Sequence, residues 1–388
     1  MRQTNTSGRF STPPGMPAIF AVGWSGRLLA ACMVSLIAWQ SCAAADRART
    51  LNIYAWAEYF PRALIDAYEK ETGIHVNYSV LDSPEAAETI LSVGHSNYDL
   101  VTMNASPELA REIPHGFWRT LDSAAMPNAR NADPQVMRLL EAADPGNRHA
   151  IPWMWGTTGI LYDRDKIRAI MPNAPVDSLD MVLKKEIAQK FASCGISMLD
   201  SWGDILPMVS RYLGQPRLSA DGRELGAVMA KLQEVQRYVR RISSSGYYQQ
   251  LAEGELCLAI GYSGDAMVAR RMVEESHGKA HIDYAFAREM VPFYIDSMVI
   301  PADSPNPAGA QSFIDFAMRP AISASVTRFI GFATANAAAV PLLEPAVRAN
   351  PIIYPPPEVR RRFELQRVYT PEENQAFTRA WLTFKSGL

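Results

Sequence analysis

The feature that most constrains the fold is a regular alternation of strand and helix signals that begins at residue 51. Short β-rich runs occupy 51–56, 74–80 and 98–103, and helical segments are expected at 62–71 and 84–93. Strands that alternate with helices in this way form a sheet covered by helices. The sequence therefore predicts an α/β lobe in this part of the chain.

Local signals at the ends of these segments support the same prediction. Gly73 is a good left-handed terminator for the first helix, and Asp82-Ser83-Pro84 supplies cap and first-turn chemistry for the second. Ligands of such sheets lie beyond the carboxyl ends of the strands. This rule points to 56–59 and to 104–106, which directly follow two of the strands.

The chain is too long for one such lobe. Its 388 residues imply about two domains at roughly 100–200 residues per domain. The apolar, β-rich run AIPWMWGTTGILY could carry the chain from one lobe into another. Further helices are expected at 182–192, 225–242, 307–318 and 321–330, further strands at 195–199, 257–262 and 291–300, and a rigid surface connection at 351–360.

The first 45 residues read as a secretion signal. They contain three arginines but no Asp or Glu, followed by an apolar stretch at 28–39 that is too short to span a membrane. Ala43-Ala44-Ala45 offers a small-residue cleavage site, so cleavage is expected after Ala45. Lipidation at Cys32 is an alternative, but Arg27 interrupts the apolar segment that would have to precede it.

Charge argues against nucleic acid as a partner. Without the signal, 35 Lys and Arg face 40 Asp and Glu, a net charge near −5. A hydrophobic fraction of 48% is ordinary for a soluble globular chain, so disorder is not expected. Mild acidity suits a cationic solute, although a balance this small is compatible with any solvated surface.

Two cysteines, Cys194 and Cys257, remain after cleavage. In an oxidising compartment they are expected to form a disulfide, which would stabilise the fold by roughly 4 kcal/mol in the chain-entropy description. Composition cannot show that they are close, so a pair of buried thiols is the alternative.

Signatures of catalysis and metal binding are weak. The chain has no phosphate-binding GxxxxGK[ST] loop, no GxGxxG after a strand and no His-Glu-x-x-His helix. In GYSGD the second glycine, Gly264, is one place too early for a GxSxG nucleophile elbow, so Ser263 is interpreted as a turn residue. His277 and His281 have ligand spacing, but Gly278 lies between them and no third ligand is near, so they are interpreted as surface histidines. No cofactor or metal is expected.

Carboxylates flanked by aromatic residues recur at predicted strand ends. The cases are Trp56/Glu58/Tyr59, Trp202/Asp204, Tyr262/Asp265 and Tyr294/Asp296. An ammonium group that leaves water needs an opposed carboxylate, and an aromatic face adds cation–π attraction of up to about 2 kcal/mol. Any one case could be a ring at a lobe edge beside a helix-capping acid, but the four together indicate a site for an organic dication.

From about Leu51 to Leu388 the chain resembles the periplasmic putrescine- and spermidine-binding receptors of bacterial ABC transporters, the putrescine type above all. The shared segments are collinear: LNIYAW, YEKETGI, Asp82-Ser83, YDLV, MWGTTGILY, NAPVDS, SCGISMLD, AIGYSGD, IPAD, ANPIIYPP and FKSGL. The resemblance implies a two-lobed periplasmic-binding fold of type II-like architecture with two hinge crossovers, and a disulfide between Cys194 and Cys257. The expected division is a signal at 1–45, a first lobe at 46–153 plus 272–325, and a second lobe at 154–271 plus 326–388.

The family's ligand residues fall on Trp56, Ala57, Glu58, Tyr59, Asn104, Asp204, Ser244, Tyr262, Asp265, Tyr294, Asp296 and Phe332. By resemblance, the aromatic residues would sandwich an alkyl chain. Asp296 would take one ammonium, and Asp204 with Asp265 would take the other.

Several of these positions depart from the family's usual residues. Serine is usual for Ala57, aspartate for Glu58, serine for Asn104, glutamate for Asp204, tryptophan for Tyr262 and tyrosine for Phe332. Two hydroxyls are lost and two carboxylates change reach, so hydrogen bonds of about 1–3 kcal/mol each could be missing or rerouted through water.

The resemblance implies a function in binding rather than catalysis. We expect a monomeric receptor in the periplasm, not anchored by lipid, that binds a polyamine and docks on a membrane ABC permease. The alternatives are a receptor for another small organic amine, a sensor that signals to a membrane partner, and a hydrolase that uses two of the carboxylates, for which the sequence gives no support.

Overall fold

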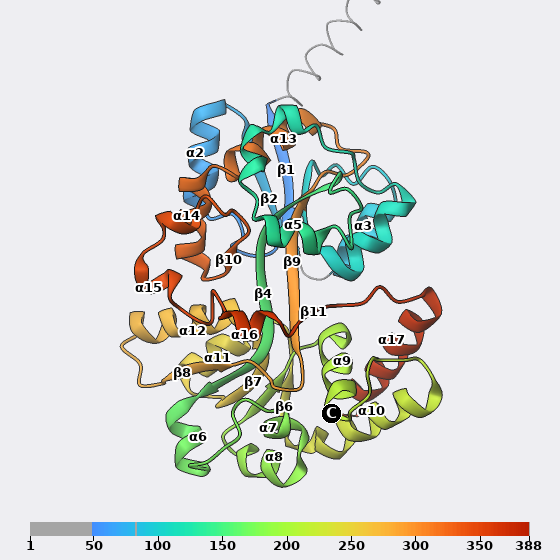
Figure 1. Ribbon diagram of the computed structural model, residues 1–388, viewed down its shortest axis with the longest axis vertical. Coiled ribbons are helices and arrows are strands. Elements are labelled where there is room, and N and C mark those ends of the chain that lie inside the picture. Colours follow the sequence, from blue (N-terminus) through green and yellow to red (C-terminus); the bar gives the residue numbers. More distant parts are fainter. Residues whose placement is uncertain (1–48, 82–83, 388) are drawn as a thin grey trace, which may run out of the picture. The chain divides into compact units, whose positions relative to one another are not determined.

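The computed structural model describes residues 49–81 and 84–387, and Figure 1 shows these residues as two lobes joined by two long strands. The expected secretion signal at 1–45 and the Asp82-Ser83 helix cap lie outside the described residues. None of the described helices is both long and apolar enough to cross a membrane.

The first lobe is built on a largely parallel sheet. Strand β1 (Thr50–Ala55) lies between β2 (His75–Val80) and β3 (Leu100–Asn104) and is parallel to both. On its other edge β3 pairs antiparallel with β9 (Val291–Val299). The carboxyl ends of β1 and β3 therefore lie at one edge of the sheet, as the sequence predicts.

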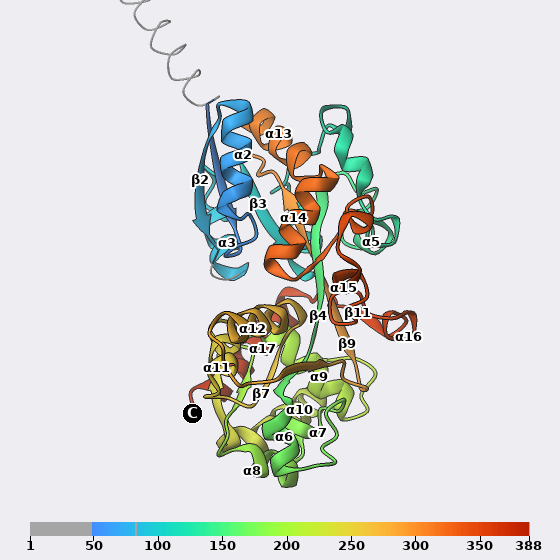
Figure 2. The same ribbon diagram turned by 90° about the vertical axis from the view of Figure 1, so that its left-hand side faces the viewer.

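Two strands connect the lobes. Strand β4 (Ala150–Asp163) is buried along its whole length and pairs with β9 over its first half and with β7 (Leu258–Tyr262) over its second. Figures 1 and 2 show β4 and β9 side by side where the chain passes between the lobes. The expectation that AIPWMWGTTGILY carries the chain across is confirmed, and β9 is the second crossover.

The second lobe has its own small sheet. Strand β5 (Ile196–Met198) is parallel to β7 and to β6 (Val239–Ile242), and β8 (Ile282–Ala285) pairs antiparallel with β4. Because β5 and β7 are parallel, their carboxyl ends lie at the same edge of this sheet.

Helices cover both sheets. Those of the first lobe are α2 (Arg62–Thr72), α3 (Pro84–Ser92), α4 (Ala110–Glu112), α5 (Pro134–Leu140), α13 (Pro307–Ala317) and α14 (Pro320–Ile330). Those of the second are α6 (Arg164–Ile170), α7 (Asp180–Leu183), α8 (Lys185–Phe191), α9 (Trp202–Tyr212), α10 (Gly222–Val235), α11 (Tyr247–Glu253), α12 (Ser263–Glu275) and α17 (Pro371–Lys385). The remaining strands and α-helices of the described residues are β10 (Ala333–Thr334), α15 (Pro345–Arg348), α16 (Pro357–Arg360) and β11 (Phe363–Leu365).

Each lobe has its own hydrophobic core. Phe313 packs in a cluster formed by residues of β1, β4 and α13 in the first lobe. Phe377 and Trp381 of α17 pack in a cluster with the second-lobe sheet. The last helix of the chain therefore covers the second lobe, after β11 has paired in parallel with β9 beside the crossover.

The packing bears on where each lobe begins and ends. Val273 and Ile282, from a stretch expected in the first lobe, pack in the second-lobe core. Ile330 and Phe332, from a stretch expected in the second, pack in a first-lobe core. The residue-level division therefore stays a proposal. This packing favours placing Val273 and Ile282 in the second lobe and Ile330 and Phe332 in the first.

Local predictions for the helices hold in part. Gly73 ends α2 in the left-handed region at φ +70°, with its N–H donating to the Glu69 carbonyl, as predicted. The prediction of a helix at 225–242 is wrong at its C-terminal end, because Val239 instead pairs with Ile196 as part of β6. The helix expected at 182–192 is interrupted where Lys184 adopts extended dihedrals.

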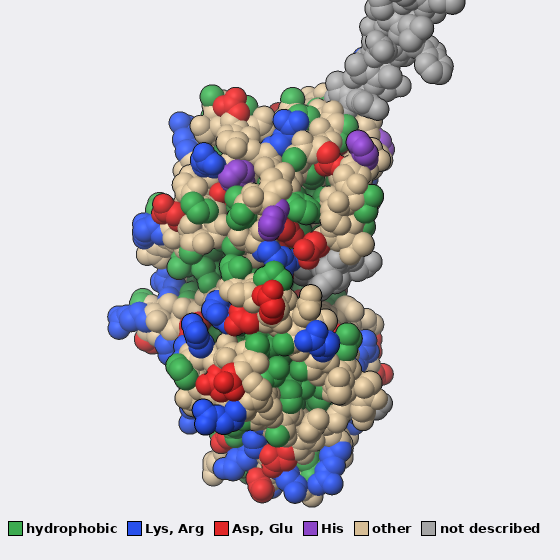
Figure 3. All heavy atoms as spheres, turned by 90° about the vertical axis from the view of Figure 1, so that its right-hand side faces the viewer, with side chains coloured by type: hydrophobic (Ala, Val, Ile, Leu, Met, Phe, Trp, Pro, Cys, Tyr) green, Lys and Arg blue, Asp and Glu red, His purple; other side chains and the backbone are tan. Residues whose placement is uncertain are grey.

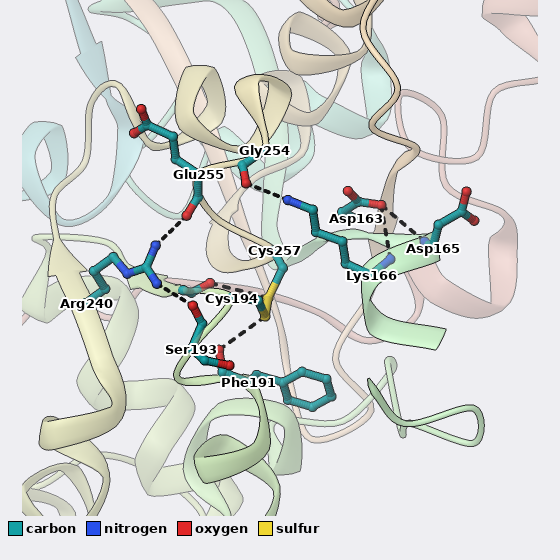
Figure 4. Close-up of a disulfide and its surroundings, with 11 residues drawn as sticks. Asp163, Asp165, Lys166, Phe191, Ser193, Cys194, Arg240, Gly254, Glu255 and Cys257 are labelled. Carbon is teal, nitrogen blue, oxygen red and sulfur yellow. Dashed lines mark hydrogen bonds between the residues drawn. A yellow bond between two sulfur atoms is a disulfide. The ribbon is translucent and has the colours of Figure 1, made fainter. Parts of the chain in front are cut away.

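A disulfide links Cys194 and Cys257, with 5.6 Å between their Cα atoms, as predicted. It joins the loop before β5 to the start of β7 (Figure 4). Arg240 bridges the same two segments, because its guanidinium donates to the Ser193 and Glu255 carbonyls at 2.7 and 2.5 Å. The covalent bond and the arginine hold together the strand ends opposite to those that carry the candidate ligand residues.

Candidate functional site

The turn after β1 carries the first four candidate residues. The Tyr59 N–H donates to the Trp56 carbonyl at 3.2 Å, which closes the turn, and Glu58 within it has φ +64°. Ala57 and Glu58 are exposed, Trp56 is partly exposed and Tyr59 is buried. The turn therefore directs the Tyr59 ring inward and leaves the Glu58 carboxylate at the surface of the lobe.

Asp296 on crossover strand β9 lies next to this turn. Its side chain is buried, and its Oδ2 accepts a 2.5 Å hydrogen bond from the Tyr59 hydroxyl. Burial raises the pKa of Asp296 to about 6, although hydrogen bonds from the Tyr59 and Trp56 side chains oppose the shift. Asn104, at the end of β3, is the register partner of Asp296, and its buried Oδ1 has no hydrogen-bond partner among the described residues.

Asp265 lies in the first turn of α12, directly after β7. The hydroxyl of buried Tyr247 donates to its Oδ2 at 2.5 Å. Burial raises the pKa of Asp265 to about 7, the Tyr247 hydrogen bond opposes this, and the Glu58 carboxylate adds to it. Since Glu58 belongs to the first lobe, acidic groups of both lobes act on each other here.

Asp204 lies in the first turn of α9, after β5. Its carboxylate accepts hydrogen bonds from Thr158 at 2.7 Å, Ser201 at 2.7 Å and Tyr262 at 3.2 Å. Burial raises the pKa of Asp204, and the three hydroxyl groups oppose the shift. The structure thus brings Asp204 to the same group of side chains as Asp265.

Aromatic rings connect the carboxylates. The rings of Tyr262 and Tyr294 meet edge to face at 5.5 Å, Tyr294 lies 6.4 Å from Phe332, and Phe332 lies 5.9 Å from Tyr59. This chain of rings runs from Asp204 in the second lobe to Asp296 on the crossover strand. Apolar faces bordered by carboxylates suit an alkyl chain with cationic ends.

Glycines make room for these rings. A Cβ atom at Gly156 would overlap the Tyr294 hydroxyl, and one at Gly264 would overlap the Phe332 ring. Gly156 is the register partner of Tyr294 across β4 and β9, and Gly264 is the second residue of α12. Both glycines are required by close approach of a ring.

Ser244 is exposed in the loop between β6 and α11 and forms no hydrogen bond with the other candidates among the described residues. The remaining predicted residues lie in or beside the cluster of carboxylates and rings.

Sequence reasoning missed three residues that hold the carboxylates in place. Tyr247 and Thr158 carried no signal, because each reaches its aspartate through tertiary contact. Ser201 could have been found, since Ser201-x-x-Asp204 has the spacing of a helix capping box. The interpretation of Ser263 as a turn residue is wrong, because it begins α12.

No basic side chain of the described residues forms an ion pair with Asp204, Asp265 or Asp296. The salt bridges among the described residues all involve other carboxylates. Nor does any group of three or more His, Cys, Asp or Glu side chains in the described ranges have metal-binding geometry. On the molecular face in Figure 3, acidic and basic side chains are interspersed.

Two lobes, two crossover strands and a cluster of residues at facing strand ends define a solute-binding protein. The chain belongs to the family of bacterial extracellular solute-binding proteins, which it matches over residues 63–355. Membership in this family makes it a binding protein rather than an enzyme.

Individual relatives agree with this assignment. The chain is 40% identical to the putrescine-binding periplasmic protein SpuD of Pseudomonas aeruginosa, covering 93% of this chain and 98% of that one. It is 37% identical to the putrescine-binding periplasmic protein PotF of Escherichia coli, covering 87% and 92%. The solved structure of a putative spermidine/putrescine ABC transporter from Listeria monocytogenes superposes with a TM-score of 0.78 at 26% identity, covering 88% of this chain and 100% of that one.

Proposed function

We propose that this protein captures a polyamine, a putrescine-like dication, between its lobes in the periplasm and delivers it to an ABC permease. The observation that carries the proposal is the set of three carboxylates, Asp204, Asp265 and Asp296, which lie among aromatic rings without a basic partner in the described chain. Asp296 is buried and Asp204 and Asp265 are half-buried. Carboxylates withdrawn from water without a cation are costly, and a ligand with two ammonium groups would remove that cost.

In this proposal the two ends of the ligand meet different lobes. One ammonium group pairs with Asp296, beside Tyr59 and Asn104. The other pairs at the end where Asp204 and Asp265 lie. The methylene chain lies against the rings of Trp56, Tyr262, Tyr294 and Phe332. Ala57, Glu58, Tyr59, Asn104 and Ser244 complete the proposed ligand set.

The relatives support the ligand class. Two of them are named as putrescine-binding periplasmic proteins, and the chain covers more than nine tenths of each. Because the ligand would bridge carboxylates at both ends of the site, the receptor is expected to close around it by a hinge motion at β4 and β9. The closed form would then dock on the permease.

The second candidate is a receptor or sensor for a different small organic amine. It is favoured by Ala57 and Phe332, which lack the hydroxyl groups usual at these positions. Calorimetric titration of the mature chain with putrescine, cadaverine, spermidine, agmatine and cationic amino acids separates the candidates. Heat of binding with putrescine at micromolar affinity or better supports the leading one, and heat with none of the linear amines would refute it.

Delivery is tested separately from capture. In proteoliposomes that contain the permease encoded with this receptor, ligand-loaded protein should stimulate ATP hydrolysis more than unloaded protein does. Equal hydrolysis with both forms would favour a sensor.

The role of Asp296 gives the sharpest single-residue test. Asp296→Asn should weaken putrescine binding at least about 30-fold, the equivalent of about 2 kcal/mol, since an ammonium group would be left poorly paired. The matched control is Asp66→Asn, which removes an exposed carboxylate on α2 and should leave the affinity unchanged. Unchanged affinity in Asp296→Asn would exclude the proposed role.

A further inference from the structure

The second lobe presents two aspartates at equivalent local positions. Asp204 is the third residue of α9 and Asp265 is the third residue of α12, and each helix follows a strand of the same parallel pair. Both carboxylates are therefore in the first turn of a helix, where negative charge is favoured. Any difference between them comes from the groups that surround them.

Asp204 has most of its hydrogen-bonding capacity filled by the protein. The Ser201 hydroxyl donates to Oδ2, and its oxygen accepts from the Asp204 N–H at 3.3 Å as the N-cap of α9. Thr158 donates to Oδ1, and Tyr262 donates to Oδ2. A carboxylate offers about four acceptor positions, so three hydroxyl groups leave little room for an ammonium.

Asp265 has a single hydroxyl partner. Tyr247 donates to Oδ2, while Oδ1 makes no hydrogen bond within the described residues. Tyr247 is itself held rigidly, because its oxygen accepts from the Tyr262 N–H at 2.9 Å and its ring occupies the space that a Cβ at Gly261 would need. The carboxylate is thus fixed in position by one oxygen and open at the other.

We propose that Asp265 is the residue of this pair that binds the ligand's second ammonium group, that Tyr247 positions it, and that Asp204 instead positions the Tyr262 ring. This inference rests on the proposed function as a polyamine receptor. It divides the roles of two aspartates that the family resemblance assigns to the same ammonium group.

Tyr262 and Asp204, two of the candidate ligand residues, bind each other through the Tyr262 hydroxyl. A tyrosine in this place needs an acceptor for its hydroxyl, and Asp204 supplies one. This pairing leaves Asp265 as the carboxylate of the two that is free to contact the ligand.

Matched asparagine variants test the proposal by calorimetry with putrescine at pH 7.5. Asp265→Asn is expected to lose at least about 30-fold in affinity. Asp204→Asn is expected to stay within about 5-fold of the wild type, since the amide oxygen of the new side chain would still accept from Thr158 or Tyr262. An Asp204→Asn loss equal to or greater than that of Asp265→Asn would overturn the proposal.

A double-mutant cycle with Asp204→Ala tests whether Asp204 acts through Tyr262. Tyr262→Phe keeps the ring and removes the hydroxyl, and far-UV circular dichroism checks each variant for native structure. If Asp204 acts through Tyr262, Tyr262→Phe should change the affinity in the wild type but not in Asp204→Ala, which leaves the Tyr262 hydroxyl without this acceptor. Additive losses would contradict the coupling.

The pH dependence of affinity distinguishes positioning from a general structural role. The titratable groups facing Asp265 are Glu58, Tyr59, Tyr247, Tyr248, Tyr262 and Tyr294. Because the Tyr247 hydrogen bond favours ionised Asp265, Tyr247→Phe should shift the midpoint of the affinity–pH curve to higher pH, and Asp204→Asn should leave it unchanged. A midpoint that moves with Asp204→Asn and not with Tyr247→Phe would reverse the assignment.

Failure of this inference is distinguishable from failure of the proposed function. A wild-type protein that binds no linear amine refutes the function itself. A wild-type protein that binds putrescine, with Asp204 as the more sensitive aspartate, refutes only the division of roles.

Discussion

Asp265 and Asp296 illustrate how a binding site can cost stability. Burial raises the pKa of Asp265 to about 7 and that of Asp296 to about 6, well above the value near 4 expected in an unfolded chain. A group with a raised folded-state pKa binds its proton more tightly in the folded protein. Its stabilising contribution is present below about pH 4 and is lost as the pH rises through 6 to 7.

Asp265→Asn should therefore stabilise the unliganded protein at pH 8. The variant removes a half-buried charge and keeps an oxygen that can accept from Tyr247. We expect the free energy of unfolding to rise by about 1–2 kcal/mol and the Tm by about 2 °C at pH 8, with little difference at pH 4.5. Thermal scans of both proteins without ligand measure this, and a variant less stable than wild type at pH 8 would contradict it.

The candidate site could be found from the sequence wherever chemistry is visible in neighbouring residues. Tyr294 with Asp296 and Tyr262 with Asp265 stand together in the chain, and the structure brings both pairs into one cluster. Tyr247 could not be found, because it meets Asp265 only after α11 and α12 pack together. The saturation of Asp204 likewise depends on Thr158, which lies 46 residues away in the chain.

At the scale of elements, the first turn of α12 has no room for a side chain at Gly264, because the Phe332 ring packs against its backbone. Gly264→Ala should reduce the free energy of unfolding by about 1–3 kcal/mol and weaken putrescine binding about tenfold, because the added methyl group would displace the ring. Gly226→Ala in α10 is the matched control, since a Cβ there meets no atom within 4 Å.

The control should behave in the opposite way. Alanine is the better helix former by about 1 kcal/mol, so Gly226→Ala should stabilise the protein and leave binding unchanged. Denaturant unfolding and calorimetry give both quantities. A stabilised Gly264→Ala variant with normal affinity would show that Phe332 does not depend on this glycine.

The disulfide is placed to support the second lobe without touching the candidate site. Cys194 and Cys257 lie before β5 and β7, whereas Asp204 and Asp265 follow the opposite ends of these strands. The Cys194→Ser/Cys257→Ser variant should lose about 4 kcal/mol of stability and about 5 °C in Tm, and should bind putrescine with unchanged affinity. Loss of affinity in the folded variant would show that the bond shapes the site.

The elements of the first lobe could be predicted closely, because alternation, Gly73 and the strand ends are local signals. The elements of the second lobe are harder to predict from the sequence. Residues 239–242 have apolar positions that suit helix or strand, and pairing with β5 decides the outcome. Such pairing is a tertiary effect that propensity cannot anticipate.

At the scale of the whole molecule, β4 and β9 are shared by both lobes, and each carries residues of the candidate site. Asp296 and Tyr294 lie on β9, while Thr158 and Gly156 lie on β4. A ligand held at Asp296 and at Asp265 therefore contacts a crossover strand and the second lobe at once. Binding and the relative position of the lobes are expected to be coupled, since a ligand that bridges both favours their approach.

Calorimetric titration of the mature wild-type protein with putrescine, at pH 7.5 and low salt, tests the central claim most directly. We predict one site per chain with a dissociation constant in the micromolar range or tighter, and weaker binding at pH 5.5, where Asp265 and Asp296 are protonated. Absence of heat with putrescine, cadaverine, spermidine and agmatine, or affinity that rises as the pH falls, would contradict it.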